Sequence, residues 1–326
     1  MIGIIIGSIC GAILLAFILL FLMCELTFRK VFFQRSDGDV RIHYAPISEE
    51  LDVESVSFKN NKKATLNGFI YKKKGSNSKR LVIVSHGLGA GHAYLRPLIN
   101  YLANKGFAVF AYDNYASSLS EGKVVTCMSQ AIIDLKYAIE FITSRKQFSK
   151  NAEINLLGHS WGGFAVLNAL NFKDIKINKI VSFAGFDNDG KFCAGNSKFL
   201  RAFSFVITLR NALYCGKYAF YSASKGLKLN KDTKVYYLQG KLDETINPKD
   251  SGYVFEKINN PNLKVEMLDN KYHSPFIADS AEKEAMQVLK DFGIFGGGNA
   301  PLDTINYENI STPDMEIYQK VLNFLN

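Results

Sequence analysis

The segment from Ile154 to Ala165, INLLGHSWGGFA, constrains the fold of this chain more than any other stretch. A short apolar run is followed by Gly-x-Ser-x-Gly-Gly and then by small residues that begin a helix. This order is typical of a sharp strand-to-helix turn that exposes a serine side chain, here Ser160. Gly158 and Gly162 fit such a turn, because its strained backbone crowds its neighbours. The alternative interpretation is an ordinary loop serine beside two packing glycines.

Apolar runs and helical patterns alternate along most of the chain. Six continuous apolar runs are typical of strands buried on both faces, and two alternating segments before them predict an antiparallel pair. We therefore expect an α/β fold with an eight-stranded, mostly parallel sheet and helices on both faces. The expected strands are Val53–Phe58, Ala64–Tyr71, Leu81–Ser85, Phe107–Tyr112, Ile154–Leu157, Ile180–Ala184, Lys234–Leu238 and Leu263–Met267, and the clearest helices are Tyr94–Lys105 and Ala131–Arg145.

The chain begins with an uncharged apolar run from Ile2 to Cys24. It is long enough to cross a bilayer as a helix, which takes about 20 residues. A cleaved signal peptide is the alternative, but the run is long, has no basic start and is not followed by a small-residue cleavage site. We expect a single-pass membrane protein with an anchor over 1–24, a juxtamembrane linker over 25–50 and the main domain over 51–326.

The charges that follow the apolar run indicate an orientation. Arg29, Lys30 and Arg35 outnumber Glu25 there, so the positive-inside rule places the main domain on the cytoplasmic side.

Beyond the anchor, the cysteines show no paired or metal-ligand spacing, and we expect neither a disulfide framework nor a zinc site. Reduced thiols would agree with the cytoplasmic placement. The cysteines beyond the anchor are Cys127, Cys193 and Cys215.

Residues 186–232 form a longer connection than parallel sheets usually need. The segment contains a helical pattern over Ser197–Leu213 and many aromatic residues, so we expect a helical cap whose apolar face lines an acyl pocket. Its basic residues, among them Lys198, Arg201 and Arg210, would favour an anionic substrate head or a bilayer surface. The alternative is that the aromatic residues complete the core and that the charges form a solvated surface. No nucleic-acid-binding motif accompanies these charges.

A nucleophilic serine needs a base, and elimination among five histidines indicates His273. His86 and His92 lie near the end of the first core strand, His159 adjoins the serine, and His43 lies in the linker. His273 follows the last core strand, at the carboxyl edge of the sheet where sites of open α/β folds form. An ordinary loop histidine is the alternative.

Asp243 is the expected acid that orients the base, because it follows the strand ending at Gly240. Glu244, Asp187 and Asp189 are the alternatives.

An oxyanion hole needs two N–H donors, and we expect the backbone of Trp161 and of Leu88, in the glycine-rich loop after Val84, to supply them. The glycines of that loop lack the spacing of a dinucleotide-binding site, and we expect no metal or organic cofactor.

These motifs resemble the α/β-hydrolase superfamily over about 53–326, and most closely its bacterial esterases, monoacylglycerol-lipase-like and dipeptidyl-peptidase-like members. The resemblance rests on Ser85-His86-Gly87, on the segment around Ser160, on Gly240-Lys241-Leu242-Asp243 and on His273. Many relatives also carry Asp-x-Arg-Gly-x-Gly-x-Ser-x-Gly after the fourth strand. Here Tyr115, Ala116 and Ser118 stand at the arginine and two of the glycine positions.

Together with the apolar N-terminal run, the resemblance implies a membrane-anchored serine hydrolase that cleaves carboxylic esters or thioesters, acyl lipids among them. Ser160 would attack the carbonyl, His273 would carry the proton, Asp243 would stabilise the imidazolium, and the N–H groups of Leu88 and Trp161 would hold the oxyanion. A peptidase or an acyltransferase would use the same machinery. A catalytically inactive, membrane-tethered binding protein is a further alternative, whereas dehalogenases and epoxide hydrolases place aspartate at the position of Ser160. The sequence leaves the oligomeric state open.

Overall fold

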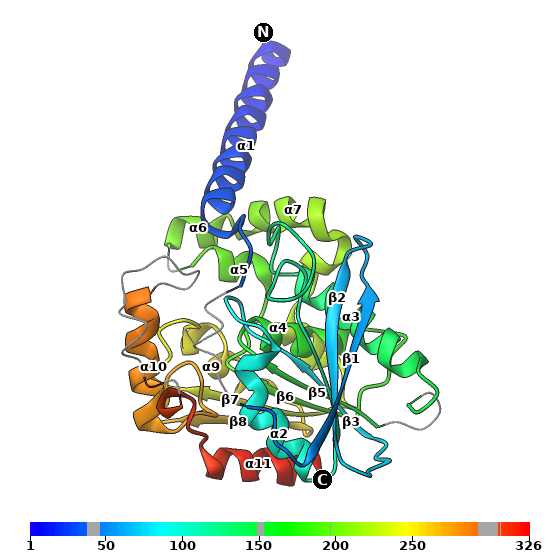
Figure 1. Cartoon of the computed structure of the whole chain (residues 1–326). Coiled ribbons are helices and arrows are strands. Elements are labelled where there is room, and N and C mark those ends of the chain that lie inside the picture. The colour runs from blue at the N-terminus through cyan, green and yellow to red at the C-terminus, as the bar shows by residue number, and fades with distance from the viewer. Residues whose placement is uncertain (38–45, 149–152, 196, 293–305, 307) are drawn as a thin grey trace.

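The computed structural model describes residues 1–37, 46–148, 153–195, 197–292, 306 and 308–326. Its centre is one eight-stranded sheet with the strand order β1-β2-β4-β3-β5-β6-β7-β8 (Figure 1). β2 pairs antiparallel with β1 and β4, and all other neighbouring strands are parallel. All eight predicted strands are therefore confirmed. They are β1 (Leu51–Lys59), β2 (Thr65–Lys73), β3 (Arg80–Ser85), β4 (Ala108–Tyr112), β5 (Glu153–His159), β6 (Lys179–Phe183), β7 (Lys234–Gly240) and β8 (Leu263–Leu268).

Helices cover both faces of the sheet and bury two apolar layers. One layer joins the sheet to α3 and α4, and the other joins it to α2 and α11. β3 and β4 are apolar and buried almost throughout because they lie between these layers. The helices of the main domain outside residues 186–232 are α2 (Arg96–Asn104), α3 (Gln130–Ser144), α4 (Trp161–Asn168), α9 (Gly252–Phe255), α10 (Asp279–Phe292) and α11 (Met315–Leu325).

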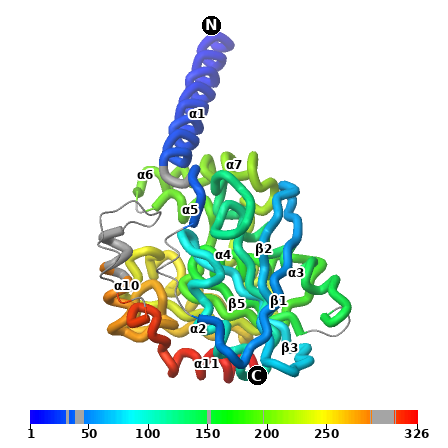
Figure 2. The backbone as a smooth tube through the Cα atoms, viewed as in Figure 1, coloured from blue at the N-terminus to red at the C-terminus, as the bar shows by residue number. Residues whose placement is uncertain are grey.

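The N-terminal helix α1 (Ile2–Phe32) projects from one end of the domain (Figure 2). It is one helix of 31 residues, so it continues past residue 24, where we expected the anchor to end. Residues 1–16 are exposed on every side, and the 29 residues from Ile2 to Lys30 are long and apolar enough to cross a membrane.

The segment after α1, which we expected to be a juxtamembrane linker, contacts the domain. Arg35 donates hydrogen bonds to the carbonyls of Ser118 and Gly122, and the buried Ser36 donates its N–H to Ala116 O at 2.8 Å. The last turns of α1 and residues 34–37 therefore belong to the domain that we predicted to begin at 51. Residues 38–45 of the predicted linker lie outside the described residues.

Residues 186–232, named the cap segment below, connect β6 to β7 and are helical as predicted. The predicted helix over Ser197–Leu213 is interrupted at Phe203. The helices of the cap segment are α5 (Asp189–Cys193), α6 (Lys198–Ala202), α7 (Ser204–Cys215) and α8 (Ala223–Leu229). Of these, α6 and α7 lie at the end of the domain from which α1 emerges (Figure 1).

Two of the basic cap residues that we expected to face an anionic substrate head or a bilayer surface are held in ion pairs. Arg201 forms an ion pair with Asp250 on the domain. Arg210 is fully buried, and its Nε lies 2.6 Å from the Glu25 carboxylate on α1. Both cations join the cap segment to its neighbours, and because Arg210 is fully buried, the expectation that it faces a substrate head or a bilayer was wrong.

The structure also pairs two cysteines that the sequence analysis treated as separate thiols. Cys127, before α3, forms a disulfide with Cys215 at the end of α7, across 88 residues of sequence. Their Cα atoms are 7.0 Å apart, and both side chains are buried. Local spacing could not indicate this pair, because it forms only when the cap segment packs on the domain. The expectation that no disulfide forms was therefore wrong.

Candidate active site

Ser160 occupies a strained turn between β5 and α4. Its φ of 55° and ψ of −114° lie where residues other than glycine are rarely found. A Cβ atom on Gly158 would clash with the backbone of Gly162, and one on Gly162 would clash with the carbonyl of Ser85. The Ser160 N–H donates to Phe183 O at 2.8 Å, which fixes the turn against β6. Strain held this firmly is typical of a functional residue.

His273 and Asp243 meet at the carboxyl edge of the sheet. His273 Nδ1 lies 3.1 Å from Oδ1 and 3.0 Å from Oδ2 of Asp243. The Asp243 side chain is fully buried, whereas 12% of the His273 side chain is exposed. This contact fixes the imidazole ring through Nδ1 and leaves Nε2 as the nitrogen that can exchange protons with a substrate.

The Asp243 carboxylate is itself held in place by three donors. The N–H groups of Thr245 and Ile246 each donate to Oδ1 at 2.9 Å, and Gln239 Nε2 donates to Oδ2 at 3.1 Å. Two of the alternative acids bind elsewhere. Asp187 accepts from Ser222 and Ser224, and Asp189 accepts from Ser129.

Asp243 raises the pKa of His273, and His273 lowers the pKa of Asp243, so each residue favours the charged form of the other. Burial lowers the pKa of His273, but the Asp243 carboxylate and, after it, Glu282 together raise it by more, so the net shift is upward from 6.5. Burial raises the pKa of Asp243, but His273 and the hydrogen bonds to the carboxylate lower it by more. An ionised Asp243 can therefore stabilise an imidazolium at His273.

The loop that carries His273 is fixed by residues that the sequence analysis did not single out. The buried Glu282 carboxylate on α10 accepts hydrogen bonds from the N–H groups of Tyr272 and Ser274, on either side of His273. The largely buried Lys271 forms ion pairs with Asp279 at 2.6 Å and Asp314 at 2.8 Å. These contacts hold the loop to α10 and to the start of α11.

His159 also contacts the His273 loop. Its Nε2 donates to the backbone carbonyl of His273 at 3.0 Å, and the two rings pack with their centroids 4.8 Å apart. Burial lowers the pKa of His159 to about 3, with the nearby His273 as a second cause. His159 is therefore a neutral hydrogen-bond donor that connects the residue before Ser160 to the loop of His273.

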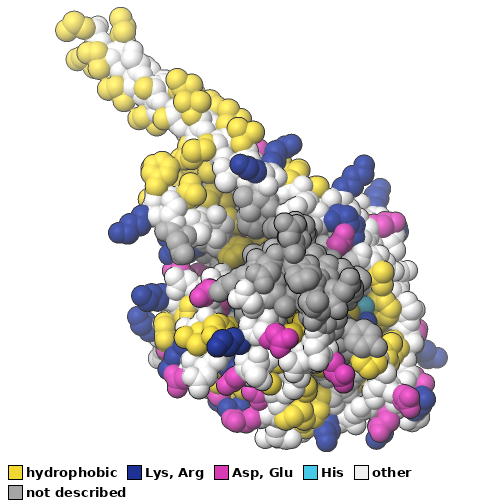
Figure 3. Space-filling view, turned by 60° about the vertical axis from the view of Figure 1, so that its left-hand side comes forward, with side chains coloured by type: hydrophobic (Ala, Val, Ile, Leu, Met, Phe, Trp, Pro, Cys, Tyr) yellow, Lys and Arg dark blue, Asp and Glu magenta, His cyan; other side chains and the backbone are white. Residues whose placement is uncertain are grey.

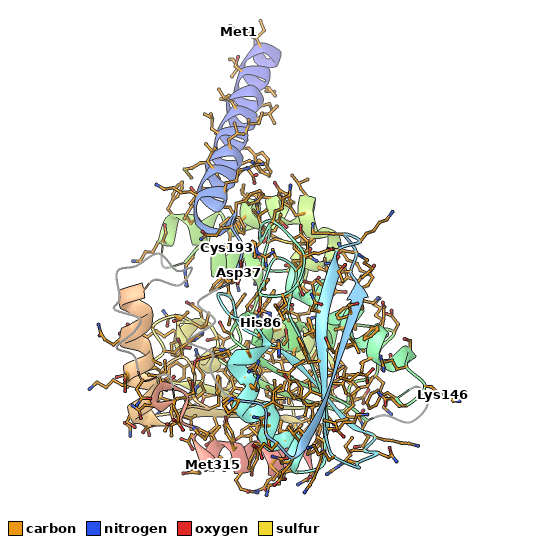
Figure 4. All side chains as sticks on the ribbon, in the orientation of Figure 1. Met1, Asp37, His86, Lys146, Cys193 and Met315 are labelled. Carbon is orange, nitrogen blue, oxygen red and sulfur yellow. A yellow bond between two sulfur atoms is a disulfide. The ribbon has the colours of Figure 1, made fainter. Side chains whose placement is uncertain are left out.

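The remaining described histidines serve the domain rather than the site. His86 Nε2 accepts from the N–H of Asn114 at 2.9 Å, and His92 Nδ1 lies 2.9 Å from Asp113. Both side chains are buried, and Figure 4 places His86 inside the domain. His43 lies outside the described residues.

The loop after β3 lies against the strained serine. A Cβ atom on Gly87 would be 3.3 Å from both Ser160 Cβ and His159 Nδ1, so any larger side chain here would crowd the serine. Leu88 follows directly in this loop, and the Gly89 N–H donates to Ser36 Oγ at 2.5 Å. Trp161 is the first residue of α4, where helix N–H groups have no partner within the helix. The two expected oxyanion donors therefore belong to segments that adjoin Ser160.

The loop after β4 adopts a left-handed backbone at two positions that are not glycine in this chain. Ala116 has φ 58° and Ser118 has φ 45°, at the two positions where the relatives carry glycine. The Asp113 side chain holds the loop by accepting from His92 and Leu119. Alanine and serine therefore adopt this conformation at a steric cost that glycine would not incur.

Within the described residues, no group of three or more histidine, cysteine, aspartate or glutamate side chains is arranged to hold a metal ion. The chemistry available at this site is that of a serine hydroxyl, an imidazole, a carboxylate and backbone N–H groups. This set is suited to acyl transfer through a covalent serine intermediate.

Comparisons with known proteins agree with the fold. Residues 76–209 match the family profile described as serine aminopeptidase, S33. A proline iminopeptidase of Saccharolobus solfataricus is 38% identical over 115 residues, which span 35% of this chain and 35% of that protein. The match therefore covers about a third of the curated relative's length.

Solved structures resemble a larger share of the chain. A Pyrococcus furiosus esterase has a TM-score of 0.58 at 22% identity, over 80% of this chain and 98% of that chain. A Pyrococcus horikoshii acylaminoacyl peptidase has a TM-score of 0.55 at 15% identity, over 79% of this chain and 44% of that chain. The sheet order, the local sequence matches and these folds together show that the chain belongs to the α/β-hydrolase superfamily.

Proposed function

We propose that this chain is a membrane-anchored serine hydrolase that cleaves carboxylic ester or thioester bonds, including those of acyl lipids. The observation that carries the proposal is the hydrogen bond between His273 and Asp243 in loops at the carboxyl edge, next to the strained Ser160. The ring of His159, the residue before Ser160, packs against His273 and links the two halves of this arrangement.

In this proposal Ser160 Oγ attacks the acyl carbonyl while His273 Nε2 accepts its proton. The Asp243 carboxylate stabilises the resulting imidazolium, and the N–H groups of Leu88 and Trp161 stabilise the oxyanion. His273 then donates the proton to the departing alcohol or thiol. Water, deprotonated by His273, attacks the acyl-enzyme and releases the acid, so the cycle uses no metal or organic cofactor.

The exposure of α1 supports the membrane anchor. Sixteen residues at its N-terminus are exposed on every side although most are apolar, and a bilayer would cover them. Retention of the helix is supported by its packing, because Phe17, Leu20 and Phe21 contact an apolar cluster that includes Val206 and Ile207 of the cap segment. Removal of α1 would expose that cluster.

Amide hydrolysis is a second candidate, favoured by the match to the serine aminopeptidase family and by the local identity to a proline iminopeptidase. The same serine chemistry cleaves both kinds of bond, so the surroundings of the site decide the substrate. An acyltransferase would differ in passing the acyl group to an alcohol or amine instead of water.

A substrate panel on the full chain in detergent tests these proposals. Esters, thioesters and N-terminal proline amides are compared, with Ser160→Ala as the control for contaminating activity. Faster turnover of esters and thioesters supports the first proposal, whereas faster turnover of proline amides supports the second. A native protein as slow as Ser160→Ala on all three would support the inactive binding protein.

The side of the membrane is tested by protease protection in intact cells. Arg29 and Lys30, in the last turns of α1, favour the cytoplasmic placement of the domain. The Cys127–Cys215 pair weighs against it, because disulfides persist mainly in oxidising compartments. A cytoplasmic domain would be protected and would carry both thiols reduced. Cleavage from outside, together with an intact disulfide, would reverse the orientation.

A further inference from the structure

The cap helix α7 presents an apolar stripe on its outer side. Phe205, Leu209 and Leu213 recur at four-residue intervals and are 53%, 39% and 75% exposed. The opposite side of the helix is buried and includes Val206 and the charged Arg210. A helix on the surface of a soluble domain normally has the reverse distribution, with polar residues facing outward. The stripe therefore indicates a surface that meets an apolar environment.

The stripe lies at the end of the domain where α1 emerges. Phe17, Leu20 and Phe21 of α1 pack against a cluster that includes residues of α6 and α7. In Figure 3, hydrophobic side chains continue from the projecting helix onto the part of the domain at its base. The exposed side of the cap segment and the apolar anchor thus form one apolar surface.

The length of α1 brings the cap segment to the bilayer. Sixteen residues precede its first contact with the cap at Phe17, and at 1.5 Å per residue they span about 24 Å. The hydrocarbon core of a bilayer is about 30 Å thick. Because about 20 residues of α1 are needed to cross this core, the membrane-crossing part of α1 includes Phe17 and Leu20. The cap residues packed against Phe17 and Leu20 therefore lie at the membrane boundary.

The charges around the stripe suit an anionic lipid surface. All charged residues from Ser197 to Phe220 are basic, and the exposed Lys198 and Lys217 stand at either end of α6 and α7. Lys30 is exposed in the last turns of α1. Amphipathic segments that lie in a membrane interface combine an apolar face with such basic residues.

We propose that α6 and α7 form a second membrane contact, in which the Phe205–Leu209–Leu213 stripe lies in the head-group and acyl boundary of an anionic bilayer beside α1. This inference rests on the proposed membrane anchoring and deepens it. The site faces the same end of the domain, because Ser36, four residues after α1, binds the Gly89 N–H in the loop after β3. A lipid ester could therefore reach the site from the membrane surface.

Tryptophan quenching in proteoliposomes tests this contact with the full chain. Phe205→Trp and Leu213→Trp are reconstituted in phosphatidylcholine vesicles that contain phosphatidylglycerol and brominated acyl chains. Met315→Trp is the matched control, because Met315 is 54% exposed and lies on α11, at the end of the domain opposite Met1 (Figure 4). The native Trp161 is buried in every variant and supplies a constant background.

The expected result is a loss of the added emission in Phe205→Trp and Leu213→Trp, and little loss in Met315→Trp. Bromine near the head groups should quench more strongly than bromine at the chain ends, because interfacial helices lie about 5–10 Å deep. Equal, weak quenching of all three variants in vesicles that carry the protein would overturn the proposal. Failure of the protein to float with the vesicles would also overturn it, together with the anchor.

A charge variant separates this inference from the proposed chemistry. Leu209→Asp with Leu213→Asp should slow hydrolysis of an ester lipid in vesicles and leave a short water-soluble ester unaffected. Met315→Asp should affect neither. Loss of both activities in the double variant, without a loss of fold, would contradict a purely interfacial role. If the unmutated protein does not hydrolyse the short water-soluble ester, that result would refute the proposed function instead.

Discussion

The Glu25 carboxylate on the N-terminal helix α1 lies 2.6 Å from Nε of Arg210 on the cap helix α7, although the two residues are 185 positions apart in the sequence. Arg210 also donates to the carbonyl of Thr126, and its guanidinium lies 3.8 Å from the Phe28 ring centroid. The guanidinium is fully buried. Arg210 therefore joins α1, the cap segment and the loop before α3.

Glu25→Ala should lower the free energy of unfolding by on the order of 3 kcal/mol, because it leaves the buried Arg210 without its anionic partner. Thermal unfolding of the full chain in detergent measures the effect. Arg29→Ala is the matched control, since Arg29 also contacts Glu25 at 2.6 Å but is exposed. Combining Glu25→Ala with Arg210→Met should recover part of the loss. Equal melting temperatures for Glu25→Ala and Arg29→Ala would show that the pair is not stabilising.

Ser118→Gly should stabilise the protein by about 1 kcal/mol, because glycine adopts the φ of 45° at this position without the steric cost of a Cβ atom. The change is read as a rise in the melting temperature. Leu119→Gly is the control, since Leu119 is exposed and is not among the described residues with positive φ. It should destabilise the domain slightly through chain entropy. A fall in melting temperature for Ser118→Gly would mean that contacts of the serine outweigh the strain.

Asp243→Asn should move the acid limb of the activity profile to lower pH and lower kcat by about 10³–10⁴-fold. The base must be neutral, and Asp243 raises the pKa of His273, so the native acid limb should lie above pH 6.5. Removing the carboxylate removes this upward shift. Full pH profiles of kcat for the native protein and the variant measure it. An unmoved acid limb would show that another group controls the base.

The same pair also links stability to pH. Because the pKa of His273 is higher in the folded state, its contribution to stability is present below pH 6.5 and is lost as the pH rises through the folded pKa. Asp243→Asn should flatten this decline in melting temperature. A decline that persists in the variant would have to come from other groups.

Ser36→Ala should lower kcat by roughly fivefold, because the Gly89 N–H loses a hydrogen bond worth about 1 kcal/mol and the Leu88 loop loosens. KM for a short ester should change little, and Ser36→Thr should restore most of the rate. Ser76→Ala, which removes a similar amide contact in a distant turn, is the control. A rate loss in Ser76→Ala as large as in Ser36→Ala would indicate a general loss of stability.

The sequence predicted the sheet and the position of the candidate residues because both follow from local patterns. Apolar runs between helical patterns define the strands, and the carboxyl ends of parallel strands share one edge. Ser160, Asp243 and His273 each follow such a strand closely. Their chemical roles remain predictions that the experiments above address.

The features that the sequence could not predict depend on contacts between distant segments. Ser36 and Glu282 have no motif of their own, and they become part of the site only when the juxtamembrane segment and α10 pack on its loops. The basic pattern of the cap segment was misleading for Arg210, because periodicity does not reveal that a charged side chain faces inward toward Glu25.

The most direct test of the central claim is covalent labelling of the full chain with a fluorophosphonate, followed by mass spectrometry of its peptides. A nucleophilic Ser160 predicts one adduct, on the peptide that contains Ser160. The adduct should be absent from Ser160→Ala and strongly slowed in His273→Ala, while Ser160→Ala keeps the native melting temperature. An unlabelled native protein, or a label that persists on Ser160→Ala, would contradict the assignment of Ser160 as the nucleophile.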